Sequence, residues 1–255
     1  MKYELLKGDT IELPNGVTLY RIRACRNIRP EVPKGILGGY VQNRDNLSQT
    51  GRSWIYDGAR VYGGAAVCDD ARVYGAAEVH GAAEVRDRAE VYGYAEVYGY
   101  AKVRDYARVC GNARVYSSTC LFGHTVVNGN ARVHGHAVLH DLAKVHDNAV
   151  VYGNAELCDN AIVYDNAEVG GDAIVCGSAI VCSNRDYQVF KNSWSSYRWF
   201  TYTASNRQWK VGCFLGSGEA LVKKAYADSE RSGKCYEAIV KAVEAIEAAK
   251  GGADE

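Results

Sequence analysis

Small and apolar residues recur every six positions along about half of the chain. From residue 58 to residue 183 the pattern runs for 21 hexads without an insertion or a deletion. Within a hexad, position two is Ala, position four is Val, and position six is mostly Gly or Asp. The exceptions at positions two and four are Thr119, Thr125, Leu121, Leu139 and Leu157. A period this strict indicates a repeat architecture, and residues 52–57 fit as one more hexad in front.

A period of six predicts short β-strands joined by corners. Side chains alternate between the two faces of a strand, so positions two and four point inward while positions three and five point outward. Gly, Asp, Asn and Ser at positions six and one tolerate tight or left-handed bends. A helix is excluded, because a six-residue period matches no helical stripe and Val favours strand. We therefore predict a mainly β fold in which Ala and Val fill a narrow core.

The repeat resembles the hexapeptide-repeat family, whose members form left-handed parallel β-helices. Segments such as Asn-Ala-Arg-Val-Tyr at residues 112–116 carry this resemblance. More narrowly, the chain is similar to Ala-x-Val-Tyr-Gly repeat proteins of bacteria and phages, which often bear a provisional transferase label. The Leu-Gly-Gly-Tyr-Val segment at residues 37–41 adds to the likeness. The resemblance implies three hexads in each coil, about seven to eight coils, and three subunits packed side by side.

With three hexads in each coil, the outward residues align in columns on three faces. Early coils place opposite charges in neighbouring rungs, such as Arg60 with Glu78, and each such pair contributes little to stability. Later coils turn apolar residues outward on the second and third faces. These residues are Phe122, Val126, Val138, Ile162, Ile174 and Ile180. An apolar outward surface needs a cover, so we predict a homotrimer that packs through the later coils.

Residues 1–51 predict a small β unit that caps the first coil. Residues 10–13 and 17–22 flank a Pro-Asn-Gly segment, which is a hairpin signal. Basic residues crowd this unit: they are Arg21, Arg23, Arg26 and Arg29. They predict either a local anion site or a solvated strand edge that its charge protects from aggregation. The β-helix itself is predicted to span residues 52–183.

Residues 184–255 predict a separate α+β unit. Residues 200–203 and 209–214 suggest a hairpin, Ser217 caps a helix to about residue 227, and a second helix runs from about residue 233 to 250. Aromatic and basic residues gather before these helices: they are Trp199, Arg198, Trp209, Arg207 and Tyr202. Aromatic platforms beside guanidinium groups suit a flat anionic ligand such as a nucleotide. The alternative is that the aromatic rings form the core of this unit.

Composition narrows the classes of function. The 30 basic and 30 acidic residues give a formal net charge of zero, which argues against a protein that binds duplex nucleic acid. No apolar run is long enough to span a membrane, and the first residues lack the apolar region of a signal peptide, so we expect a cytoplasmic protein. The nine Cys show no short-range pairing, and we expect them to act as reduced small hydrophobes. Cys158 and Cys176 should stack on one face, where oxidation could join them.

Several residues of the repeat are candidates for chemistry. Tyr116 and His134 on the first face complete the predicted ligand-binding set. The irregular segment at residues 117–125 either marks a site or holds two buried Thr hydroxyls bonded to neighbouring backbone. His134, His140 and His146 share position five but lie on three different faces, so one subunit predicts no metal site.

Three classes of function remain open. The first is a non-catalytic trimer that captures a small nucleotide-like anion in inter-subunit grooves, as a phage sponge for immune signals would, and it needs no cofactor. The second, implied by the resemblance, is an acyltransferase that uses acyl-CoA as co-substrate, with His134 or His80 as general base. The third is a structural or protein-interaction module. A binder retains unaltered ligand whereas an acyltransferase consumes acyl-CoA, which distinguishes the first two classes.

Overall fold

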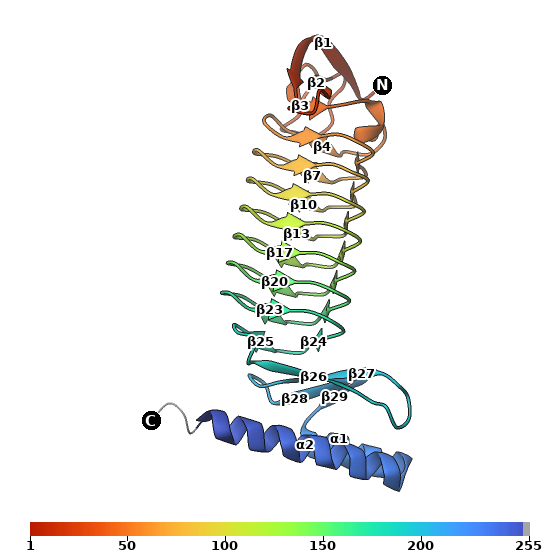
Figure 1. Ribbon diagram of the computed structural model, residues 1–255. Helices are drawn as coiled ribbons and strands as arrows, with labels where there is room; N and C mark the ends of the chain where they lie inside the picture. Colours follow the sequence, from red (N-terminus) through yellow and green to blue (C-terminus); the bar gives the residue numbers. More distant parts are fainter. Residues whose placement is uncertain (252–255) are drawn as a thin grey trace.

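The computed structural model describes residues 1–251 and shows a long β-solenoid with a different unit at each end (Figure 1). The mainly β fold is confirmed. The solenoid consists of three parallel sheets, and the sheet that forms the third face has eight strands, one in each turn. Arg60 pairs with Glu78 and Glu90 with Arg108, so partners in neighbouring turns are 18 residues apart, as three hexads in each coil require.

Every solenoid strand consists of positions three and four of one hexad. The first face contains β5 (Arg60–Val61), β8 (Glu78–Val79), β11 (Glu96–Val97), β14 (Arg114–Val115), β17 (Arg132–Val133), β20 (Val150–Val151) and β23 (Glu168–Val169). The second face contains β6 (Ala66–Val67), β9 (Glu84–Val85), β12 (Lys102–Val103), β15 (Cys120–Leu121), β18 (Val138–Leu139), β21 (Glu156–Leu157) and β24 (Ile174–Val175). The third face contains β4 (Trp54–Ile55), β7 (Arg72–Val73), β10 (Glu90–Val91), β13 (Arg108–Val109), β16 (Val126–Val127), β19 (Lys144–Val145), β22 (Ile162–Val163) and β25 (Ile180–Val181).

The solenoid core follows the predicted inward positions. The Ala at position two and the Val or Leu at position four are buried along the whole repeat and form one continuous cluster. Thr119 and Thr125 replace Ala and are also buried, but the prediction that their hydroxyls bond the backbone is wrong. Neither hydroxyl has a hydrogen-bond partner in the described part of the chain, because both point into the core while the nearby backbone groups pair between coils.

The corners carry the backbone bends that the sequence predicted. Position six has a positive φ both at Gly, as in Gly93 with φ 75°, and at Asp, as in Asp105 with φ 58°. A Cβ added at Gly93 would lie 3.0 Å from the backbone N of Gly111 in the next coil, so the stacking of corners also restricts side-chain size. Each such Asp can in turn accept a backbone N–H from the next coil: Asp105 accepts that of Gly123 at 2.9 Å.

The N-terminal unit extends the first face rather than standing apart from it. Strands β1 (Tyr3–Glu12), β2 (Thr18–Ala24) and β3 (Leu37–Val41) pair in antiparallel order, and β3 then runs parallel to β5. The predicted hairpin is confirmed by the pairing of Thr10 with Tyr20 and of Glu12 with Thr18. A short 3-10 helix, η1 (Arg44–Asn46), precedes the first coil. The unit therefore covers the open end of the solenoid, which hides the unpaired strand edge of the first face.

The C-terminal unit is a four-stranded antiparallel sheet covered by two helices. The strands are β26 (Tyr187–Lys191), β27 (Trp199–Thr203), β28 (Gln208–Val211) and β29 (Phe214–Gly216), and the helices are α1 (Gly218–Asp228) and α2 (Glu230–Gly251). Ser217 caps α1 as predicted, since its hydroxyl accepts the N–H of Ala220. The second helix begins at Glu230 rather than at about residue 233. The sheet docks on the last coil, where the Ile174 N–H donates to Thr201 Oγ1 at 2.8 Å.

Cysteine usage differs from the sequence prediction at one pair. Seven Cys are free, as predicted. Cys158 and Cys176 form a disulfide, so the prediction that all nine are reduced is wrong for this pair. Both occupy position five of the second face in neighbouring coils, which puts their Cα atoms 4.7 Å apart, within the range of disulfides. Neither α1 nor α2, nor the short η1, is long and apolar enough to cross a bilayer, which agrees with the sequence.

Candidate functional site

The predicted tail residues divide between two places. Trp209 and Tyr202 are 2% and 7% exposed and belong to the core of the C-terminal unit. With Arg207 they line a hollow of about 440 Å³ beneath α2. Glu244 and Glu247 line the same hollow, so its carboxylates outnumber its one guanidinium group. This excess of negative charge disfavours an anion.

Arg198 and Trp199 lie apart from that group. Arg198 contributes to a different hollow of about 230 Å³, which β28, β29 and the helices also line. Trp199 is 38% exposed, and the Lys191 ammonium group lies 5.2 Å from its ring centroid. The structure thus brings together Tyr202, Arg207 and Trp209 but not the full aromatic and basic set.

Tyr116 and His134 lie in a stack of aromatic rings on the first face, which we call the ring ladder. Its members are Tyr62, His80, Tyr98, Tyr116, His134 and Tyr152. The centroids of Tyr116 and His134 are 4.9 Å apart, with an interplanar angle of 12°. The ladder ends at Gly170, because the Tyr152 ring occupies the space that a Cβ there would need. The ladder is on a different part of the molecule from the tail residues.

The surroundings of the two His in the ring ladder favour the neutral form of the imidazole. Burial lowers the pKa of both His80 and His134 below its ordinary value of 6.5, and Arg132 adds to the effect at His134. Aromatic neighbours cover both faces of each imidazole. Within residues 1–251, neither imidazole forms a hydrogen bond with a carboxylate that could orient it as a general base.

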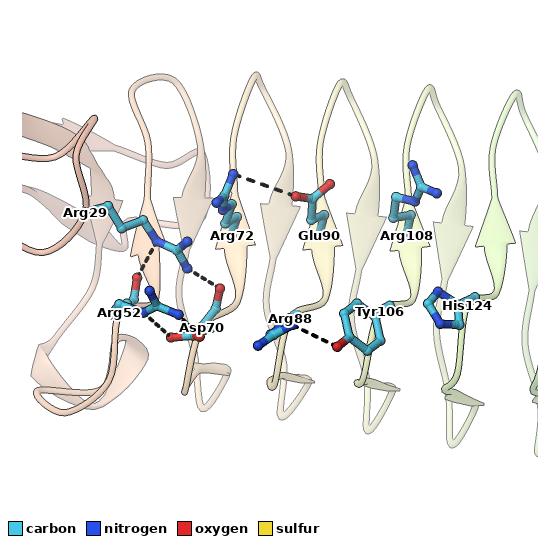
Figure 2. A pocket seen from close by; sticks show the side chains of 9 residues that line it. All are labelled: Arg29, Arg52, Asp70, Arg72, Arg88, Glu90, Tyr106, Arg108 and His124. Carbon is cyan, nitrogen blue, oxygen red and sulfur yellow. Dashed lines mark hydrogen bonds and ion pairs between the residues drawn. The ribbon is translucent and has the colours of Figure 1, made fainter.

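A third location gathers far more positive charge. It is a shallow hollow of about 490 Å³ beside the corner between the second and third faces, near the N-terminal unit (Figure 2). We call it the corner hollow. Its lining residues are Arg29, Arg52, Asp70, Arg72, Arg88, Glu90, Tyr106, Arg108 and His124. Five guanidinium groups therefore face two carboxylates, on a chain whose formal net charge is zero.

The 18-residue coil aligns these side chains. Arg52, Asp70, Arg88, Tyr106 and His124 occupy position one in five successive turns, so they form one column along the corner. A second column runs beside the first, at position three of the third-face strands. It supplies the other lining residues that belong to the repeat. These are Arg72 of β7, Glu90 of β10 and Arg108 of β13. Neighbouring turns lie about 4.8 Å apart, so charges recur at that spacing along the hollow.

Two of the guanidinium groups are paired with carboxylates. Arg52 Nη2 lies 2.6 Å from Asp70 Oδ2. Arg72 lies 3.7 Å from Glu31 and 4.0 Å from Glu90. These pairs neutralise part of the charge and hold the acidic side chains in place, as the dashed lines in Figure 2 show for the residues drawn there.

The other three guanidinium groups have no carboxylate partner in the part of the chain that the structure describes. Arg29 donates to the backbone carbonyls of Arg52, at 2.7 Å, and of Asp70. Burial, and then the neighbouring Arg72, lower the pKa of Arg29, while Tyr56, Asp70 and Glu31 act in the opposite direction. Arg88 donates to the Tyr106 hydroxyl at 2.8 Å. Arg108 makes neither a salt bridge nor a side-chain hydrogen bond to any residue from 1 to 251.

An aromatic pair closes one end of the corner hollow. The rings of Tyr106 and His124 stack with centroids 4.7 Å apart and planes 10° apart. The Arg88 guanidinium carbon lies 5.4 Å from the Tyr106 centroid. A flat ring could stack at this end while anionic groups meet the arginines, which is the combination of contacts that nucleotides use.

The sequence predicted the basic character of the N-terminal unit and the opposite charges in neighbouring rungs of the early coils, but not the hollow. The signal was available at position one, where the 18-residue spacing aligns Arg52, Arg88 and Tyr106 in one column. Arg29 could not be placed in this way, because no repeat relates it to the corner.

The comparisons with known proteins support the architecture. The family described as YdcK Beta solenoid repeat matches residues 107–120, the segment that contains β13 and β14 and reaches the start of β15. No curated protein matches the chain. The chain is thus similar to YdcK-type β-solenoid repeats over that segment, which includes Arg108 of the corner hollow.

Proposed function

We propose that the protein is a non-catalytic binding protein, which captures a small polyanion with a flat ring, such as a nucleotide, in the corner hollow. The observation that carries this proposal is the excess of guanidinium groups over carboxylates beside a stacked aromatic pair. An anion that meets Arg29, Arg88 and Arg108 supplies the charge that the folded chain does not provide there. Sequestration of a nucleotide immune signal, as in phages, is one role that such binding serves.

The chemistry of arginine supports phosphate as the anionic group. A guanidinium group presents several N–H donors in a planar fork that matches phosphate oxygens. A hydrogen bond to a charged group contributes about 1.5–3 kcal/mol, so two or three such contacts give about 3–9 kcal/mol before the cost of association is subtracted. Micromolar binding needs about 8 kcal/mol, so stacking of the ring on Tyr106 must supply the rest. The openness of the hollow to solvent favours a ligand that dissociates unaltered rather than one enclosed for reaction.

The corner hollow is formed by one chain, so this proposal differs from the expected inter-subunit groove. The homotrimer remains a prediction, and it is supported by apolar residues such as Ile180, which is 43% exposed at the last coil. The left-handed hexapeptide-repeat geometry likewise remains the proposed finer classification of the solenoid. The tail residues Arg198, Trp199, Tyr202, Arg207 and Trp209 are the competing location for the ligand.

The acyltransferase alternative lacks an observation in its favour. His80 and His134 are clamped in the ring ladder without an orienting carboxylate, as described above. The alternative remains open to a direct assay, in which consumption of acyl-CoA by the purified protein would support it.

Isothermal titration calorimetry with ATP tests the proposal. Arg88→Ala and Arg108→Ala should each weaken ATP binding about tenfold to a hundredfold, because each removes a charged contact. Arg132→Ala is the matched control, since Arg132 is an exposed position-three residue on the first face, and it should leave binding unchanged. Adenosine and tripolyphosphate, titrated separately, divide the contribution of the ring from that of the phosphates.

Three outcomes would count against the proposal. ATP, ADP and tripolyphosphate could all fail to bind, or Arg132→Ala could weaken binding as much as Arg108→Ala does. A loss confined to Arg207→Ala or Arg198→Ala would instead locate the ligand in the C-terminal unit. Mass spectrometry of the recovered ligand decides between capture and turnover, because a binder returns it unaltered.

A further inference from the structure

A second chemical cluster lies on the second face, in the late coils and far from the corner hollow. Its members are His140, Glu156, Cys158 and Cys176, which occupy three successive turns. The donor atoms of His140, Glu156 and Cys158 all lie within 4.8 Å of one another, and Cys158 Sγ is bonded to that of Cys176. We propose that, once the disulfide is reduced, these four side chains bind one zinc ion.

The donor set suits zinc in particular. Two thiolates, one imidazole and one carboxylate give the four ligands of a tetrahedral zinc site, and thiolates disfavour magnesium and calcium. The stacking of coils places one position-five ligand on each of three neighbouring rungs, while Glu156 approaches from position three of the middle rung. Ligand atoms around one zinc are about 3.5 Å apart, so the side chains must turn toward a common centre once the two sulfurs separate. Cys176, which lies outside the group that His140, Glu156 and Cys158 form within 4.8 Å, must turn the most.

A carboxylate orients the imidazole as in many zinc sites. His140 Nδ1 lies 2.8 Å from Asp141 Oδ2, which leaves Nε2 directed to Glu156 Oε1 at 3.2 Å. Asp141 is itself fixed at a corner, where the same oxygen accepts the Asp159 N–H at 3.4 Å. Phe122 stacks on the imidazole with centroids 5.2 Å apart. Such an outer carboxylate fixes the ring and strengthens the nitrogen that binds the metal.

The two sulfurs are protected while the opposite side of the cluster is open. Cys158 and Cys176 are 4% and 2% exposed, and the side chain of Glu156 is 43% exposed. A metal ion can therefore enter from the side of Glu156. Asp159 adjoins the two Cys, but its carboxylate accepts the Gly177 N–H at 2.9 Å as a corner residue, so we assign it no ligand role.

The chemistry balances in two steps. A thiol reductant cleaves the Cys158–Cys176 bond, so that two protein thiols form and two molecules of the reductant become one disulfide. Zinc then displaces one proton from each thiol, and the two thiolates bind it together with His140 and Glu156. Oxidation to the disulfide removes both sulfur ligands, so the pair holds either a disulfide or a metal ion.

Cobalt titration of the full-length protein tests the site. The chain is reduced with a thiol, freed of metal, and titrated with Co²⁺ under anaerobic conditions, then with Zn²⁺ in competition. We expect one ion per chain and a sulfur-to-cobalt charge-transfer band that zinc abolishes. Cys158→Ser and Cys176→Ser should each weaken the band and the affinity. Cys68→Ser is the matched control, because Cys68 occupies the same column at the other end of the solenoid, and it should change neither.

Two further variants keep the test independent of folding. His140→Phe keeps a ring stacked on Phe122 but removes both nitrogens, and it should abolish stoichiometric binding. In Asp141→Asn, the Asn side chain tolerates the positive φ of this corner but lacks the carboxylate that orients His140. Zinc binding should therefore weaken about tenfold to a hundredfold. The proposal is overturned if reduced wild-type protein shows no cobalt–sulfur band, or if His140→Phe, folded by circular dichroism, binds zinc as wild type does. Equal loss in Cys68→Ser would also overturn it.

Discussion

The early and late coils of the solenoid share one interior but present different chemistry to solvent. Val73 in the second turn and Val163 near the end are both fully buried in the same third-face sheet. On the outward side of those strands, Arg72 is replaced by Ile162. The early corner gathers guanidinium groups, whereas the late coils carry apolar, His and Cys residues. Positions two and four therefore determine the fold, and positions one, three and five can acquire binding chemistry without disturbing it.

The division between inward and outward positions predicts a large difference within a single strand. Leu139→Ala should lower the free energy of unfolding by about 2–5 kcal/mol, because it leaves a cavity in a core only a few side chains wide. The neighbouring Val138→Ala faces outward and should cost less than about 1 kcal/mol in the monomer. Chemical denaturation measures both. Similar losses at the two positions would contradict the assignment of the interior.

The ring ladder tests whether outward residues can also stabilise coil stacking. Tyr98 contacts His80 and Tyr116, each with a centroid distance of 4.9 Å, so Tyr98→Ala should cost about 1–3 kcal/mol for two lost ring contacts. Tyr100→Ala is the control: Tyr100 is exposed at a corner and stacks on no ring within the described residues. Thermal unfolding compares the two. If both variants melt together, the ladder has no role in stability.

Removal of a carboxylate from the corner hollow should strengthen anion binding there, whereas removal of one from the late coils should not. Glu90→Gln leaves Arg72 and Arg108 free to meet an anion, and ATP affinity should rise by about 1 kcal/mol, or roughly fivefold. Glu168→Gln makes the same change at position three of the last first-face strand and should leave ATP binding unaltered. Calorimetry at low and high salt measures the effect, which salt should diminish. A weaker affinity in Glu90→Gln would show that Glu90 contacts the ligand directly.

The smallest expected effect is a pH dependence of stability from the ring ladder. Because burial lowers the pKa of His80 and His134 below 6.5, the unfolded chain binds more protons than the folded chain between those pKa values. The stability should therefore fall as the pH decreases through about 6.5, and the loss is complete below the folded-state pKa values. The double variant His80→Phe/His134→Phe keeps the stack and should flatten this part of the profile. Melting temperatures between about pH 5 and pH 8 provide the measurement.

The sequence predicted the regular part of the molecule in detail and the candidate sites only in part. The hexads determine which residues share a face, so the columns of Tyr62 and His80 and of Arg72 and Glu90 could be read directly from spacing. Arg29 reaches the corner hollow from an irregular segment, and its contacts with backbone carbonyls depend on how the N-terminal unit folds.

The C-terminal unit shows the same limit. Trp209 is buried whereas Trp199 is partly exposed. This difference depends on the register of β27 and β28 and on the covering helices, and local sequence patterns determine neither. The identity of the site residues was thus less predictable wherever no repeat relates one residue to the next.

The uniform 18-residue spacing also creates a problem for the folding chain. A strand that pairs one turn too early buries the same Ala and Val side chains as the correct pairing, so most of the interior cannot distinguish the two alignments. Leu121, Leu139 and Leu157 are consecutive in the second-face sheet, between Val103 and Val175, so a slip would break this run of Leu pairs. We expect these larger side chains, together with the end units, to favour one register of the coils during folding.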